Sequence, residues 1–153
     1  MASQWALIKA KIQLAVNDSL KNEVTEAVKD EMQSTISEVV YAAGTPIIYQ
    51  RRGGNNYGGM GNPDGTGSLA DKGEMKHNVV NGVLIIKNEA EPVKSSFGNL
   101  AYNIEYGYGA RDRWYNQPRP FIQETRNNLK SNKAHVKALK DGLRKRLGAN
   151  NVL

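Results

Sequence analysis

The stretch that decides the fold class is Val79-Val80-Asn81-Gly82-Val83-Leu84-Ile85-Ile86. Asn-Gly is the dipeptide preferred in two-residue type I′ hairpin turns, and here apolar strand formers flank it on both sides. In such a hairpin Val80 lies opposite Val83, and Val79 lies opposite Leu84. Both ends of the 153-residue chain favour helix. We therefore expect an α+β protein in which two long helical regions flank a small antiparallel sheet.

Upstream of the hairpin, residues 4–43 predict a helical region without proline or interior glycine. Its apolar positions recur every four residues: Ile8, Ile12, Val16, Leu20, Val24, Val28, Met32, Ile36 and Val40. Each four-residue step overshoots a full turn by about 40°, so this stripe winds around a straight helix. Either the helix breaks near Asn17-Asp18-Ser19, whose side chains can cap a new start, or it changes partners along its length. We favour a break or bend, and we interpret the stripe as mainly a core face.

The middle region, residues 45–110, predicts strands interrupted by a long loop. Residues 47–52 have the pattern of a short strand. Residues 53–67 include seven glycines, and we expect them to form a flexible, exposed loop that orders against a neighbouring molecule. The aromatic tract 99–109 favours either a short helix or a strand end. We expect one domain over residues 1–153, of a common single-domain size.

The last region, residues 118–148, predicts a helix that two prolines open and Gly148 ends. From Arg126 to Gly148 there are eight Lys or Arg residues and one acid, Asp141, which gives this segment a net charge of +7. Because the whole chain has a net charge of +6, the other residues sum to about −1. One face of this helix is basic: Arg126, Lys130, Lys133, Lys137, Lys140 and Arg144. Three interpretations stay open for this face: solvation, contact with an acidic protein neighbour, and proximity to DNA.

The chain offers little for catalysis. It has no cysteine, and neither His77 nor His135 has a partner at a spacing typical of metal ligands. The glycine-rich tract lacks the Gly-Lys-Ser/Thr ending of a phosphate-binding loop, and no Gly-x-Ser-x-Gly occurs. No signal-peptide layout and no membrane-length apolar stretch is present. We therefore expect no enzyme activity, no cofactor, no metal and no membrane association.

Three segments together resemble the tail-completion or head–tail joining (neck) proteins of long-tailed bacteriophages. The first is Val40-Tyr41 with Thr45-Pro46, then Tyr49-Gln50-Arg51-Arg52 and Gly67-Ser68-Leu69-Ala70-Asp71, similar to a run common in phage minor structural proteins. The second is 100–107, LAYNIEYG, similar to the family's Tyr-Ala-x-x-Val-Glu-Phe-Gly motif. The third is Arg119-Pro120-Phe121-Ile122, similar to an Arg-Pro-Phe-Leu that opens the family's last helix. The order of elements agrees as well. The chain departs from the pattern where Tyr102 follows the alanine and where Gln123-Glu124 replace Pro-Ala, which affects the subfamily more than the broad class.

The resemblance implies a structural virion protein that forms a ring, six-fold or twelve-fold, between the head connector and the tail. Its implied partners are copies of itself, the head connector or head-closure protein, and the tail terminator or tail-tube protein, with DNA passing nearby without sequence-specific binding. Its implied location is the virion neck, after assembly in the host cytoplasm. The implied assembly-interface residues are Tyr49, Arg51, Arg52, Tyr57, Leu69, Tyr102, Glu105, Tyr106, Arg119 and Phe121.

Two alternatives stay open. One is a minor capsid or head-closure protein, which differs only in the neighbour that it contacts. The other is a small basic DNA-binding protein that uses the last helix; it predicts tight duplex binding that falls steeply with added salt. In a neck, phosphate contacts along the channel would accumulate affinity and hinder DNA ejection. For that reason we expect most of the basic face to point toward a protein neighbour or the outer solvent.

Overall fold

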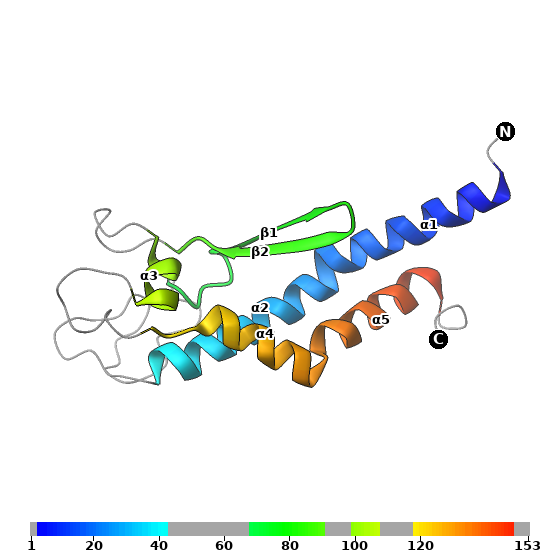
Figure 1. Cartoon of the computed structure of the whole chain (residues 1–153). Helices are drawn as coiled ribbons and strands as arrows, with labels where there is room; N and C mark the ends of the chain where they lie inside the picture. Colours follow the sequence, from blue (N-terminus) through cyan, green and yellow to red (C-terminus); the bar gives the residue numbers. More distant parts are fainter. Residues whose placement is uncertain (1–2, 43–67, 91–98, 108–117, 149–153) are drawn as a thin grey trace. The chain divides into compact units, whose positions relative to one another are not determined.

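The computed structural model describes residues 3–42, 68–90, 99–107 and 118–148 (Figure 1). Most of them are helical, and the described strands form a two-stranded sheet, which confirms the α+β class. The elements in chain order are α1 (Gln4–Ser19), η1 (Leu20–Val24), α2 (Thr25–Thr35), η2 (Ile36–Tyr41), β1 (Met75–Val80), β2 (Val83–Asn88), α3 (Leu100–Tyr106), α4 (Phe121–Asn132) and α5 (Ala134–Leu147).

The chain divides into two compact units. Unit 1 comprises Met1–Val28, His77–Ile86 and Asn132–Leu153, and unit 2 comprises Lys29–Lys76 and Lys87–Ser131. The short strand expected at 47–52 and the glycine-rich loop 53–67 lie outside the described residues.

The N-terminal helical region has no break near Asn17-Asp18-Ser19. The backbone of Ser19 is α-helical, and its hydroxyl donates to the carbonyl oxygen of Ala15 (2.7 Å) instead of capping a new helix. Instead, the helical region contains two π-helical segments: η1 lies between α1 and α2, and η2 follows α2. A π turn takes more residues per turn than an α turn, so it offsets the overshoot of a four-residue repeat. The wide turns thereby keep part of the apolar stripe on one face.

The stripe is a core face only in its second half. Val24, Met32, Ile36 and Val40 are buried, whereas Ile8 and Ile12 are 43% and 48% exposed. The interpretation as a core face is therefore wrong for the first turns of α1.

The hairpin forms as predicted. Asn81 and Gly82 both have positive φ angles, 51° and 77°, which is the backbone of a type I′ turn. The turn sets Val80 opposite Val83 and divides the side chains between two faces. One face, with Val79 and Leu84, is half-buried, while Val80, Val83 and Ile85 on the other face are exposed.

The C-terminal region is helical, but it contains two helices rather than one. Lys133 adopts a left-handed conformation (φ 57°) between α4 and α5. Lys133 is the N-cap residue of α5, and the side-chain oxygen of Asn132, just before it, accepts a hydrogen bond from the amide of Ala134 (2.9 Å) at the start of the new helix. Gly148 ends α5 with φ 90°, as expected. Because the helix axis is interrupted at Lys133, the predicted basic stripe is not one continuous helical face.

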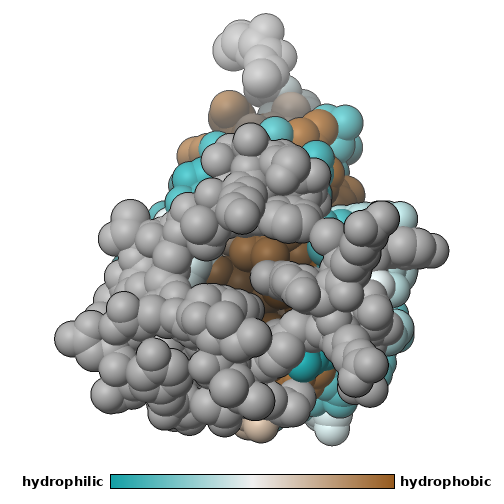
Figure 2. Space-filling view, turned by 90° about the vertical axis from the view of Figure 1, so that its left-hand side faces the viewer, coloured by the Kyte–Doolittle hydropathy of each residue, from teal (hydrophilic) through white to brown (hydrophobic). Residues whose placement is uncertain are grey.

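Each unit has its own buried residues. In unit 1, α1 and α5 lie side by side and antiparallel (Figure 1), with Ala15, Ser19 and Gly142 buried. In unit 2, the buried residues come from several segments: Met32, Ile36, Val40, Leu69, Ala70, Met75, Ala90, Ala101 and Phe121. Figure 2, seen from the end of the picture that holds α3, shows hydrophobic residues in brown in the centre of that face.

Candidate assembly site

Six of the ten predicted assembly residues belong to the described part of unit 2, and they fall into two groups. Tyr102 and Tyr106 are more than half exposed, whereas Leu69, Glu105 and Phe121 are buried and Arg119 is half-buried. Tyr49, Arg51, Arg52 and Tyr57 lie outside the described residues. The structure therefore brings together the Glu-Tyr-Gly and Arg-Pro-Phe motifs, but with different roles for their members.

Glu105 joins the two motifs by capping α4. Its carboxylate accepts hydrogen bonds from the backbone N–H groups of Ile122 (2.7 Å) and Gln123 (3.1 Å). These N–H groups lie in the first turn of α4, where the helix itself supplies no acceptor. The helix dipole adds a favourable interaction with the negative charge. Glu105 thus acts as an N-cap supplied from α3, a different part of the chain; we call this the Glu105 clasp.

The residues beside the clasp position it. The amide of Arg119 donates to the carbonyl oxygen of Ile104 (2.9 Å), and its guanidinium donates to the carbonyl oxygen of Val40 at the end of η2 (3.3 Å). Phe121, the first residue of α4, is fully buried. Gly107 adopts the left-handed conformation (φ 72°) that ends α3 directly after the clasp. Both motifs therefore hold unit 2 together internally.

The tyrosines of the motif point the other way. The rings of Tyr102 and Tyr106 lie one turn apart on α3, with centroids 4.7 Å apart and planes tilted by 50°. They are 53% and 56% exposed. Tyrosine is enriched at the centres of protein interfaces because it combines a rigid apolar ring with a hydrogen-bonding hydroxyl. This pair is the part of the motif best suited to contact another molecule.

The basic face is exposed in both units. All six predicted residues are exposed: Arg126 and Lys130 on α4, Lys133 between the helices, and Lys137, Lys140 and Arg144 on α5. Asp141 lies 3.6 Å from Arg144, a surface pair that contributes little to stability. The exposure of Lys137 and Lys140 on α5 leaves them available to a negatively charged neighbour.

Arg146, which belongs to the same basic segment, has a different role. Its guanidinium donates to Glu23 (2.8 Å), to the Ser19 hydroxyl (3.2 Å), and to the carbonyl oxygens of Gly142 (3.0 Å) and Asp18 (3.3 Å). These bonds join α5 to α1 and η1 within unit 1. The sequence did carry a signal for this contact, since a glycine inside a helical pattern, here Gly142, marks a close approach.

The Arg146 contact should make unit 1 sensitive to acid. Burial raises the pKa of Glu23, but hydrogen bonds, above all from Arg146, and the charges of Arg146 and Lys145 outweigh it and hold that pKa below its usual 4.5. A carboxyl group whose pKa is lower in the folded state stabilises the fold at pH values above its unfolded-state pKa. This stabilisation is lost as the pH falls through the folded-state pKa. We therefore expect the melting temperature of unit 1 to fall as pH drops below about 4.5. In Glu23→Gln this part of the pH dependence should disappear in thermal scans; an unchanged profile would contradict the assignment.

The surface that the sequence prediction missed lies on the first three turns of α1. Trp5, Leu7 and Leu14 are 62–78% exposed, although they are large and apolar. Ser3 is the N-cap of this helix, and its hydroxyl oxygen accepts a hydrogen bond from the amide of Ala6 (3.3 Å). The first turns of α1 are therefore capped and helical although their large apolar side chains are exposed. Sequence periodicity identifies apolar residues, but it does not say whether their partner belongs to the same chain.

The described residues offer neither a metal-binding cluster nor a membrane-spanning helix. Within the described segments, no group of three or more His, Asp or Glu residues is placed to hold a metal ion. Among the helices of residues 3–42, 99–107 and 118–148, none combines the length and apolarity needed to cross a bilayer.

Comparison with known proteins gives one family. No curated protein and no solved structure matches the chain. The model of the YomN family, which is of phage origin, matches residues 4–145. This match spans α1 through nearly all of α5 and includes both motifs of the clasp. The chain therefore belongs to the YomN family and is a protein of phage type.

Proposed function

We propose that the chain is a structural protein of the phage neck that completes the tail and joins it to the head as part of a ring. The observation that carries this proposal is the Glu105 clasp. Two short motifs that resemble neck proteins lie apart in the sequence, and the clasp joins them through two hydrogen bonds. Because one contact joins both motifs, a chance similarity of two short segments is a weaker explanation for their presence in the same chain.

Two other observations support the proposal. Membership of a phage-derived family agrees with a role in the virion. The exposed apolar residues of α1 suit a protein that works inside an assembly, because monomeric proteins rarely expose large contiguous apolar patches. On this proposal the chain has no catalytic role. Its partners are copies of itself and the proteins on the head and tail sides.

The proposal predicts a specific defect in a phage that carries an early stop codon in this gene. Filled heads and complete tails should accumulate separately, and the wild-type chain supplied in the host should restore joined particles. Electron microscopy of the lysate, together with plaque counts, makes the measurement. Normal joined particles from the stop-codon phage would contradict the proposal. Empty or unfilled heads would instead indicate the head-closure alternative.

A second candidate, non-specific DNA binding, is favoured by the exposed lysines of α5. The described residues of unit 1 include nine Lys or Arg and four Asp or Glu, a net +5 by difference. If this surface holds DNA, the isolated chain should bind duplex with an affinity that falls steeply with salt, and Lys137→Gln with Lys140→Gln should reduce the slope. Fluorescence anisotropy at several salt concentrations separates this candidate from the neck proposal, which expects weak binding.

A further inference from the structure

The N-terminal helix α1 extends beyond the end of α5, against which it packs. The two helices run side by side and antiparallel within unit 1 (Figure 1). A Cβ atom at Gly142 of α5 would lie 2.7 Å from the Ser19 hydroxyl oxygen, so these two residues mark one level of the helix pair. Because both helices rise about 1.5 Å per residue, Gly148 at the end of α5 lies level with about Gln13. The turns of α1 that precede Gln13 therefore have no part of α5 beside them.

An exposed apolar stripe continues the packed side of α1. At about 100° per residue, the side chains at positions 5, 8, 12, 15 and 19 point into one sector of about 80°. Ala15 and Ser19 are buried, whereas Trp5, Ile8 and Ile12 are 78%, 43% and 48% exposed. The stripe thus has the same direction as the contact with α5, and its residues become exposed where α5 ends.

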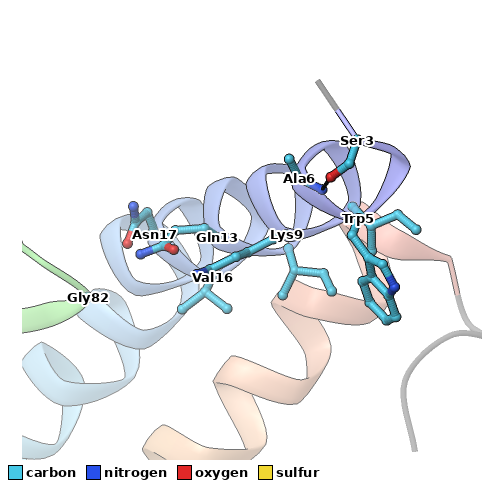
Figure 3. Close-up of a pocket in the computed structure, with 10 residues that line it drawn as sticks. Ser3, Trp5, Ala6, Lys9, Gln13, Val16, Asn17 and Gly82 are labelled. Atoms are coloured by element: carbon cyan, nitrogen blue, oxygen red, sulfur yellow. Dashed lines mark hydrogen bonds between the residues drawn. The ribbon is translucent and has the colours of Figure 1, made fainter. Parts of the chain in front are cut away.

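This stripe forms one wall of an open groove in unit 1. The groove has a volume of about 670 Å³ and reaches from Trp5, past Ile8 and Ile12, to Gly82 at the hairpin turn. Figure 3 shows Trp5 pointing from α1 toward the side on which α5 lies. The described residues that line the groove are mainly apolar, and Lys9 is the only charged residue among them. The groove therefore suits an uncharged segment with apolar side chains.

The chain itself supplies such a segment at the end of α5. Residues 149–153, Ala-Asn-Asn-Val-Leu, follow directly on Gly148 and lie outside the described residues. Gly148 has φ 90° and ψ 145°, which turns the backbone out of the helix. The level at which α5 ends is about 12 Å from Trp5 along α1. Five extended residues span about 17 Å, so the last two, both apolar, can reach Trp5.

We infer that residues 149–153 fold back along α1 and fill this groove. Val152 and Leu153 then pack on the side chain of Trp5. The segment continues the established contact between α1 and α5 beyond the end of α5. Because it is joined to α5, its local concentration at the groove exceeds that of a second copy of the chain in solution. This inference does not depend on the proposed function.

The opposite side of α1 is not covered in this way. Leu7 and Leu14 point about 130° away from the centre of the stripe. They are 62% and 63% exposed. These two leucines therefore remain available to another molecule when the groove is filled.

The test follows the fluorescence of Trp5 in the full-length chain. Trp114→Phe removes the other tryptophan. Trp5 should then emit at a shorter wavelength than free tryptophan and should be shielded from acrylamide, at every protein concentration. Val152→Ser combined with Leu153→Ser should shift the emission to longer wavelength. It should also raise the acrylamide quenching constant to that of an exposed tryptophan.

A matched control changes the same segment without removing its apolar side chains. Asn150→Ser combined with Asn151→Ser should leave the emission and the quenching of Trp5 unchanged. Thermal melting checks that all variants fold. Because the chain has no cysteine, a nitroxide attached through Asn151→Cys gives a second readout. The nitroxide should quench Trp5 in the folded chain, and its reduction by ascorbate should restore the emission.

Three results would overturn the inference. The first is an exposed Trp5 in the chain with an intact segment, and the second is unchanged shielding after Val152→Ser with Leu153→Ser. The third is shielding that disappears on dilution, which would assign the groove to a second copy. All three leave the proposed function standing, because its failure would appear separately, as normal head–tail joining by the stop-codon phage.

Discussion

Replacing Glu105 by Ala is expected to lower the free energy of unfolding by about 2–4 kcal/mol. The substitution removes an acceptor from two N–H groups at the start of α4 and leaves a cavity at a buried position. Hydrogen bonds to a charged acceptor contribute more than neutral ones, and N–H groups left without an acceptor carry a desolvation cost. Urea denaturation followed by far-UV circular dichroism measures the change, which should appear as a lower midpoint at a similar slope.

Two controls separate the clasp from general effects of charge. Glu105→Gln keeps the size of the side chain and one acceptor oxygen, so it should lose less stability than Glu105→Ala. Glu124→Ala removes a more exposed carboxylate from the first turn of the same helix and should cost no more than about 1 kcal/mol. Equal losses in Glu105→Ala and Glu124→Ala would mean that the helix dipole, not the clasp, explains the effect.

The second large effect is expected at Gly142 on α5. A methyl group there would lie 2.7 Å from the hydroxyl oxygen of Ser19, 2.8 Å from its Cβ and 2.9 Å from the carboxylate of Glu23. Because these groups belong to the packed contact between α5 and the N-terminal helices, the helices would have to separate. We expect Gly142→Ala to destabilise the chain by about 1–3 kcal/mol, although Ala favours helix over Gly by up to about 1 kcal/mol.

A double variant tests the physical reason. Ser19→Gly removes the Cβ that the new methyl group would meet, so the pair Ser19→Gly with Gly142→Ala should lose less stability than the sum of the two single variants. The coupling should be of the order of 1 kcal/mol in the same urea titrations. Additive losses would show that the close approach of the two helices does not determine the cost.

The hairpin and the helix ends could be predicted from the sequence because their signals are local. Asn81-Gly82 specifies the turn through two positive φ angles, and Gly148 ends α5 by the same property. The interruption at Lys133 is harder to predict, because a non-glycine residue rarely adopts that conformation. Asn132, whose side-chain oxygen accepts a hydrogen bond from the first amide of the following helix, is a local signal for the interruption.

The candidate site could be predicted only in part. The two motifs lie together in the structure, but the sequence does not separate Glu105, which caps a helix from a distance, from Tyr106, which is exposed. The four-residue repeat of the first helix likewise predicts apolar positions without naming their partners. Ile36 is fully buried, whereas Ile12 is 48% exposed. Such differences arise from tertiary packing, which acts between residues far apart in the sequence.

The most direct test of the neck role is to locate the chain in intact virions. Gold-labelled antibodies raised against the full-length chain, imaged by electron microscopy on purified particles, give its position. The proposed function predicts label at the junction of head and tail, and no label on particles assembled without this gene product. Label elsewhere on the virion, or its absence from purified particles, would contradict the account.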